Sequence, residues 1–296
     1  MLFELRWRTS LSTTCLHAAY CQQQGLPTCD DQLAVAIAPA AAQLSAELAS
    51  FGASDEQVLL ELCNLSADYE NNRQLAERTL ARLKGQTSTS ESAKSRLAGH
   101  VAGLEAALLR VQPDVADQLA VRGRPLREQW ESRGPGLLRA LGRMSDPGVV
   151  PESAEVVLVS PYVGGHGTAH SRNNRLVCEA VLTNPEPNIP EVVRLAWLLA
   201  QLNYDLPSFT DRVSPSRLAV IAPLANLPAA LAAGEEVELT RLDEQHVQLA
   251  LEVWHLPAAK RENAAGTLLQ WWEVVQSSND SWAVALAALD AMLFAD

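Results

Sequence analysis

The sequence is short of basic residues relative to acidic ones. Its 23 lysines and arginines face 35 aspartates and glutamates, which gives a formal net charge of −12. Binding to DNA or RNA without sequence preference needs basic side chains that displace counterions from phosphate. Arginines gather only between residues 122 and 143, where Glu128 and Glu131 oppose them, so we expect a solvated face there. No nucleic-acid partner is predicted.

Long apolar runs are also missing. No stretch reaches the roughly 18 to 20 uninterrupted apolar residues that cross a bilayer. The first ten residues mix charged and apolar side chains and lack the apolar core and cleavage site of a signal peptide. We therefore expect a cytoplasmic protein with no membrane partner.

The cysteines do not form a recognisable pattern. There are five, Cys15, Cys21, Cys29, Cys63 and Cys178, and an odd number in a chain of 296 residues favours reduced thiols over a disulfide framework. The spacing of the first three matches no common zinc knuckle, so buried thiols that pack as small hydrophobic groups are expected.

Intact catalytic motifs are absent as well. The stretch Gly164-Gly165-His166-Gly167 lacks the Lys-Ser/Thr that follows in a phosphate-binding loop, and it precedes a predicted strand instead of a helix. No Gly-x-Ser-x-Gly sequence occurs. Nucleotide binding is therefore not predicted, and a Ser-His-Asp triad of unfamiliar spacing stays open.

The most apolar part of the chain is a compact unit of two strands and a helix. Predicted strands at residues 155–160 and 176–182 flank a loop at 161–170, and a helix at 190–202 follows with few polar residues. Most other segments have the periodicity of amphipathic helices, including one long helix from Ser54 to Lys84.

The prolines and glycine of residues 146–151 predict a boundary between two lobes. We predict a mainly α, α+β fold. Residues 1–147 form a helical bundle lobe, and residues 148–296 form a lobe in which a small β-sheet packs on a buried helix and is covered by C-terminal helices.

One group of residues has the chemistry of a metal site. His166 and His170 are four positions apart, and Glu179 on the following strand is the nearest third ligand. The surrounding glycines argue against a helix that would align the two imidazoles, so solvated or locally hydrogen-bonded histidines are the alternative. Glu179 itself is interpreted either as a charge on the open face or edge of the sheet or as a buried carboxylate with a raised pKa, the type used as a general base.

The order of strand, glycine-containing loop, strand and buried helix resembles the core of zincin metallopeptidases. In that family the helix carries His-Glu-x-x-His, and the matching positions here are Ala196, Trp197 and Ala200. The resemblance implies a zincin-like scaffold without its metal, since alanine and tryptophan neither bind zinc nor activate water. Residues 160–206 also resemble a family of uncharacterised bacterial proteins, which implies no activity.

The sequence favours a protein without catalytic activity. The leading hypothesis is a cytoplasmic scaffold or protein-interaction module, a metal-free pseudo-enzyme that contacts a protein partner or forms a homo-oligomer and needs no cofactor. The alternative is a metal-dependent hydrolase that holds zinc with His166, His170 and Glu179. A small-molecule binding protein that uses the glycine loop as a lip is a third hypothesis.

Overall fold

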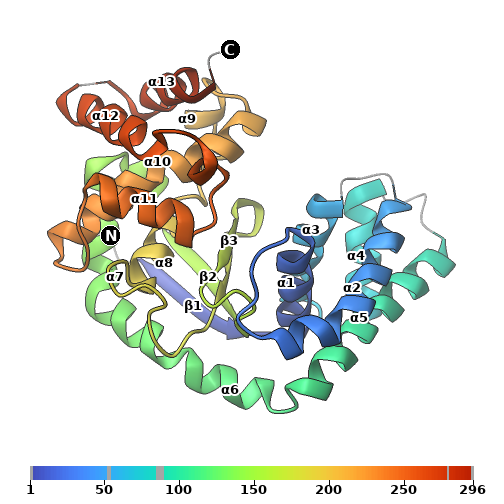
Figure 1. Ribbon diagram of the computed structural model, residues 1–296. Helices are drawn as coiled ribbons and strands as arrows, with labels where there is room; N and C mark the ends of the chain where they lie inside the picture. Colours follow the sequence, from blue (N-terminus) through green and yellow to red (C-terminus); the bar gives the residue numbers. More distant parts are fainter. Residues whose placement is uncertain (1–2, 52–54, 85–89, 279, 295–296) are drawn as a thin grey trace.

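The computed structural model describes residues 3–51, 55–84, 90–278 and 280–294. Figure 1 shows a helical N-terminal part and a helical C-terminal part on either side of a small central sheet, with α6 and α7 running beneath the sheet from one part to the other. The predicted fold class, α+β and mainly α, is confirmed.

The helices and strands have the following bounds. The N-terminal part contains β1 (Glu4–Thr9), α1 (Leu11–Gln23), α2 (Asp31–Ala49), α3 (Asp55–Ser66), α4 (Asn72–Lys84), α5 (Glu91–Val111), α6 (Val115–Arg122) and α7 (Arg124–Met144). The central part contains β2 (Ser153–Val159), β3 (Gly167–His170), β4 (Arg175–Glu179) and α8 (Glu191–Leu199). The remaining helices are α9 (Pro207–Thr210), α10 (Pro215–Glu236), α11 (Glu244–Val253), α12 (Ala264–Ser277) and α13 (Trp282–Phe294), and short 3-10 turns lie at Pro147–Val149, Ser171–Asn173 and Pro257–Lys260.

The sheet has the strand order β1-β2-β4-β3. Both β1 and β4 pair with β2 in parallel, and β3 pairs with β4 in antiparallel orientation. The continuous apolar sequences of β2 and β4 are buried, as expected for inner strands covered on both faces. The predicted strands are confirmed in place, while β1 and β3 were not predicted as strands.

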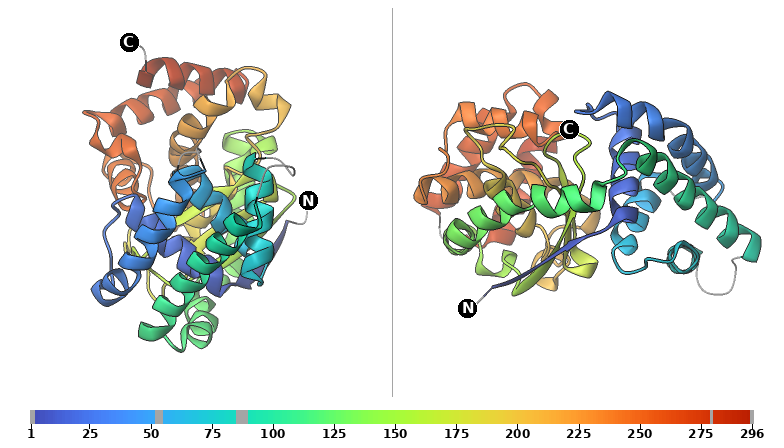
Figure 2. Two further views of the ribbon diagram at one scale, coloured as in Figure 1. Left: turned by 90° about the vertical axis from the view of Figure 1, so that its right-hand side faces the viewer. Right: turned by 90° about the horizontal axis from the view of Figure 1, so that it is seen from below.

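The predicted lobe boundary at residues 147 and 148 stays a prediction. The sheet nevertheless takes β1 from the N-terminal half of the chain, since Glu4 is in register with Ser153. Figure 2 shows β1 extending along the edge of the sheet and leading into the N-terminal helices.

Helix α8 is buried over its whole length, as its apolar sequence predicts. It packs against α7, α10, β3 and β4 and so lies at the centre of the C-terminal part. Two helices within the described residues, α2 and α10, are long and apolar enough to cross a membrane by length and composition, with 22% and 78% of their apolar stretches buried. Mostly buried core helices such as α10 pass the same test, whereas most of the apolar stretch of α2 is not buried.

The prediction of one long helix from residue 54 to 84 is wrong, because the chain turns between α3 and α4. Asn71 accepts hydrogen bonds from the backbone N–H groups of Arg73 and Gln74 and so starts α4. The predicted capping residue Ser54 lies outside the described residues.

A buried arginine fixes this turn to the sheet. Arg175 on β4 donates to Asp68 at 2.6 Å, to Glu155 at 2.6 Å and to the Asn64 carbonyl at 2.6 Å. Its side chain is 6% exposed, whereas those of Asp68 and Glu155 are 34% and 18% exposed. The network joins the α3–α4 turn to both inner strands.

We expect Arg175→Ala to lower the free energy of unfolding by about 2 kcal/mol, because charge-assisted hydrogen bonds are lost and partly buried acceptors are left without a donor. Urea unfolding measures the change. Arg172→Ala, at an exposed arginine of the preceding turn, is the control and should change stability by less than about 0.5 kcal/mol. Equal effects of the two substitutions would contradict this role of the network.

Candidate metal centre

The candidate site lies at one edge of the sheet. Because β1, β2 and β4 are parallel, their carboxyl ends meet at the same edge. Three segments come together there: α1, which follows β1, the glycine loop of residues 161–167, which follows β2, and the end of β4 at Glu179. Ligand sites of parallel sheets form at such an edge.

Glu179 is held by the glycine loop. Its two carboxylate oxygens accept hydrogen bonds of 2.7–2.9 Å from the backbone N–H groups of Tyr162, Val163, Gly164 and Gly165. The loop can wrap around a carboxylate because Gly164 and Gly165 have φ angles of 97° and 130°, which side chains disfavour. The glycines therefore serve to position Glu179.

His17 on α1 completes the surroundings of this carboxylate. Its Nε2 lies 3.0 Å from Glu179 Oε1, and both side chains are fully buried. Burial opposes ionisation of Glu179, but the hydrogen bond and charge of His17 and the loop N–H groups outweigh it and hold the pKa well below its ordinary value. Glu179 is buried, as one of the two interpretations from the sequence held, but its pKa is lowered and not raised, and it is not an exposed charge at the sheet edge.

Helix α1 also carries Cys21, one turn after His17. Ser10 caps the start of the helix by accepting a hydrogen bond from the Thr13 N–H group. The spacing of four residues places the side chains of His17 and Cys21 on one face. Cys21 Sγ lies 3.4 Å from His17 Nε2, in the buried interior.

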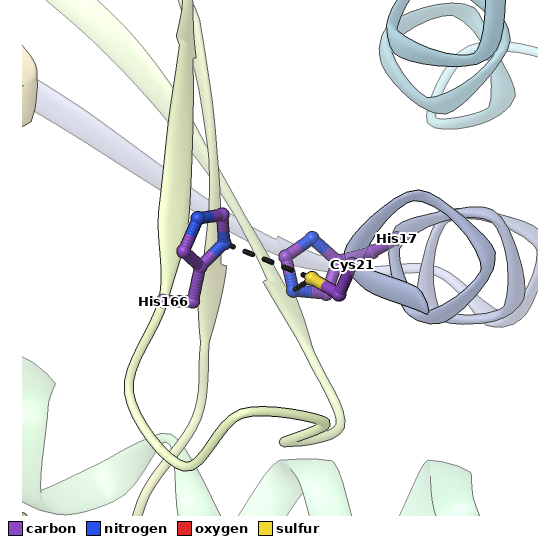
Figure 3. A group of neighbouring side chains, drawn as sticks. All are labelled: His17, Cys21 and His166. Atoms are coloured by element: carbon purple, nitrogen blue, oxygen red, sulfur yellow. Dashed lines mark hydrogen bonds between the residues drawn. The ribbon is translucent and has the colours of Figure 1, made fainter. Parts of the chain in front are cut away.

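His166 of the glycine loop faces the same sulfur. Its Nδ1 lies 3.8 Å from Cys21 Sγ, and ligand atoms of His17, Cys21 and His166 all lie within 4.8 Å of one another. Figure 3 shows His166 facing the side chains of His17 and Cys21, which lie together on α1. Burial and the charge of His17 lower the pKa of His166, so its imidazole is neutral at pH 7.

These distances fit a tetrahedral metal ion. Zinc bound to nitrogen at about 2.0 Å and to sulfur at about 2.3 Å keeps those atoms about 3.5 Å apart, and the two observed separations are 3.4 and 3.8 Å. Burial raises the pKa of the Cys21 thiol, so metal binding has to release its proton and becomes tighter as the pH rises.

Nδ1 is the ring nitrogen of His17 that a metal on Nε2 would leave free. This nitrogen is buried and has no hydrogen-bond partner within the described part of the chain. When a metal binds one imidazole nitrogen, the other usually bonds to a carboxylate or another polar group. Nε2 of His17 is the nitrogen that contacts Glu179. A metal on Nε2 would replace this hydrogen bond and move the proton to Nδ1, which has no acceptor within the described residues.

The same residues do not form a nucleophilic triad. In such a triad the histidine uses one ring nitrogen for the nucleophile and the other for the carboxylate. Here Cys21 and Glu179 both contact Nε2 of His17. The thiol is also fully buried, and burial raises its pKa, which opposes the thiolate that a nucleophile requires.

The structure brings together part of the set predicted from the sequence. His166 belongs to the cluster, and Glu179 contacts it through His17. His170 lies at the end of β3 and bonds to Thr168 Oγ1 at 3.0 Å instead. The sequence analysis missed His17 and Cys21, although their spacing on a capped helix was a usable signal.

His170 makes stability depend on pH. Burial, with the charge of Arg175, lowers its pKa to about 4. Because the ordinary pKa is about 6.5, the unfolded chain takes up a proton that the folded chain excludes. The stabilisation present above pH 6.5 is therefore lost as the pH falls towards 4.

We expect His170→Gln to reduce the loss of stability between pH 6.5 and pH 4 by on the order of 1–3 kcal/mol relative to the unsubstituted protein. Urea unfolding of metal-free protein at several pH values measures it. His100→Gln, at another partly buried histidine, is the control. Parallel pH profiles for the unsubstituted protein and His170→Gln would contradict the expectation.

The positions that match the zincin motif are packed core. Ala196 and Ala200 are fully buried. Trp197 stacks on Trp254 at 4.6 Å between ring centroids and donates to the Pro223 carbonyl at 2.8 Å. The candidate ligands thus come from α1 and the glycine loop and not from α8.

Searches of protein-family models, curated proteins and solved structures each found no match to this chain. The resemblance to zincins and to a bacterial family therefore stays a prediction, and the argument for function starts from the side chains at the edge of the sheet.

Proposed function

We propose that the protein binds zinc through His17, Cys21 and His166 and uses it for hydrolysis. One observation carries the proposal: three soft or borderline ligand atoms lie within 4.8 Å of one another, with two separations typical of tetrahedral zinc. A thiolate with two imidazoles favours zinc over magnesium or calcium, which prefer oxygen. Three protein ligands leave the fourth position for water, as in catalytic zinc sites.

Each residue at this site has a separate role in binding the metal or in positioning a ligand. Bound zinc would supply a Lewis acid and lower the pKa of a coordinated water. His17 and Cys21 present their ligand atoms from the rigid, buried face of α1. Glu179, fixed by the glycine loop, positions His17 through Nε2 before a metal would replace this contact. His166 supplies a neutral imidazole from the half-buried side of the cluster.

The metal content of purified protein tests this proposal. After zinc loading and dialysis, elemental analysis should find about one zinc per chain. His17→Ala should lose the zinc, and His170→Gln should keep it, because His170 bonds to Thr168 outside the cluster. Retention of zinc by His17→Ala, or equal loss in both variants, would reject the proposed ligand set.

A second function is favoured by the packing of α8. Ala196 and Trp197 are buried where the zincin motif would carry its zinc ligand and glutamate. The alternative proposal is a non-catalytic cytoplasmic scaffold that contacts a protein partner or a second copy of itself. In that case zinc would only hold α1 to the glycine loop. Zinc-dependent hydrolysis of ester or amide probes that Cys21→Ala abolishes would reject the scaffold.

A further inference from the structure

His166 has one ring nitrogen that the metal centre does not use. Its Nδ1 faces Cys21 Sγ at 3.8 Å, which leaves Nε2 for a partner outside the cluster. Figure 3 shows this second nitrogen on the side of the ring turned away from Cys21. An imidazole that binds a metal through one nitrogen usually donates the N–H of the other to a carboxylate, a carbonyl or a water, which fixes the ring. Because His166 is half-buried, water has access to it.

The imidazole of His255 lies beside that of His166. The two ring centroids are 6.3 Å apart, and the ring planes are inclined by 38°. His255 is half-buried as well. Since each nitrogen lies about 1.1 Å from its ring centroid, the nitrogens of the two rings approach no closer than about 4 Å, which excludes a direct hydrogen bond and leaves room for one bridging water.

His255 occupies a backbone position that usually belongs to glycine. It comes two residues after the end of α11 and has a φ angle of 54°. Its N–H donates to the Glu252 carbonyl at 3.0 Å, and the Leu256 N–H donates to the Leu251 carbonyl at 2.9 Å. These two bonds form a Schellman motif, whose left-handed residue is commonly glycine because a Cβ is unfavourable there. A histidine at this position costs stability, which points to a role for its side chain outside the turn.

A buried arginine connects this turn to the glycine loop. Arg194 on α8 is 3% exposed, and its Nη2 donates to the Val253 carbonyl at the end of α11 at 3.3 Å. Its Nη1 lies 2.9 Å from the position that a Cβ on Gly165 would occupy, so the guanidinium packs against the loop. The turn that carries His255 and the loop that carries His166 therefore contact the same side chain.

We propose that His255 positions His166 for metal binding through one water, which accepts the Nε2–H of His166 and donates to the imidazole of His255. This inference rests on the proposed zinc site and deepens it. The ligands come from α1 and the glycine loop, whereas this positioning residue comes from the turn after α11. Held in this way, the ring of His166 keeps its Nδ1 directed at the metal.

The zinc affinity and the stability of His255 variants test this role. His255→Gly should lower the zinc affinity about 10-fold, as expected for loss of a residue that orients a metal ligand. It should also raise the urea midpoint of the metal-free protein, because glycine relieves the left-handed strain. Competition with a chromogenic chelator at pH 7.5 measures the affinity. A loss of affinity together with a lower urea midpoint would assign His255 to packing and overturn the proposal.

His255→Asn separates hydrogen bonding from strain. Asparagine tolerates the left-handed conformation and keeps a polar side chain that can hydrogen-bond to a water. This variant should therefore recover part of the zinc affinity that His255→Gly loses. Affinity as low as that of His255→Gly would contradict the water bridge.

Glu238 provides a matched control. Its φ angle is 60°, its N–H donates to the Glu235 carbonyl at 3.0 Å, and the Leu239 N–H donates to the Gly234 carbonyl at 2.8 Å, so the end of α10 has the same motif. Glu238 is not part of the metal cluster. Glu238→Gly should raise the urea midpoint without changing the zinc affinity. Equal zinc affinities in this variant and in His255→Gly would overturn the role of His255.

The ring nitrogen shifts of zinc-loaded protein labelled with 15N-histidine test the link between the two imidazoles. The Nε2 signal of His166, observed through the carbon-bound ring protons, should move in His255→Gly and stay in place in Glu238→Gly. A signal that moves in neither variant would overturn the water bridge.

Zinc uptake by the unsubstituted protein distinguishes failure of the metal centre from failure of this inference. No uptake would reject the metal centre and the role of His255 with it. Uptake that His17→Ala abolishes, combined with equal affinities of His255→Gly and Glu238→Gly, would reject the role of His255 alone.

Discussion

Replacing Cys21 by alanine is expected to lower the zinc affinity of the protein more than about 100-fold. Loss of a residue that only orients a metal ligand typically costs about 10- to 100-fold, and Cys21 is placed as a ligand itself. Its sulfur is the atom that both histidines of the cluster approach, at 3.4 and 3.8 Å. Competition with a chromogenic chelator at pH 7.5 measures the affinity.

Cys15 provides a matched control for this experiment. It lies on the same helix, is fully buried like Cys21, and is not part of the metal cluster. Cys15→Ala removes the same atoms from a similar environment, so any general damage to α1 appears in both variants. If Cys15→Ala and Cys21→Ala lose equal affinity, the effect comes from packing and the proposed ligand role of Cys21 is wrong.

Glu179→Ala is expected to lower the free energy of unfolding by more than about 4 kcal/mol, which is exceptional for one substitution. The change leaves four loop N–H groups and His17 without their acceptor in the buried interior. Unpaired buried groups cost about 1–3 kcal/mol each, and water entering the space offsets only part of the sum.

Urea unfolding of metal-free Glu179→Ala tests this expectation independently of zinc. Glu152→Ala, at an exposed glutamate just before β2, is the control and should remain within about 0.5 kcal/mol of the unsubstituted protein. A loss of less than about 1 kcal/mol in Glu179→Ala would show that the glycine loop does not depend on this carboxylate.

The sequence predicts the most deeply buried parts of the fold. β2, β4 and α8 are apolar on nearly every side, so their sequences indicate core without knowledge of their partners. β1 differs, because only alternate residues are partly buried and its partner Ser153 lies far along the chain from Glu4. The break between α3 and α4 was missed because Arg175 and Arg8, both remote in sequence, stabilise the turn.

The residues of the candidate metal centre could likewise be predicted only where they lie close together in the sequence. His166 and Glu179 are close in the chain, and the Glu179 N–H donates to the His166 carbonyl at 2.8 Å. His17 and Cys21 reach them only because β1 inserts beside β2 and brings α1 to the carboxyl ends of the strands. Spacing within one segment is visible in a sequence, whereas parallel pairing over long separations is not.

X-ray absorption at the zinc edge of the loaded protein tests the central claim most directly, because it reports the atoms bound to the metal. The account predicts one sulfur at about 2.3 Å and two imidazole nitrogens at about 2.0–2.1 Å, with one lighter atom completing the set. Cys21→Ala should remove the sulfur contribution. A spectrum with nitrogen and oxygen neighbours only would place zinc elsewhere and contradict the assignment of His17, Cys21 and His166 as the metal centre.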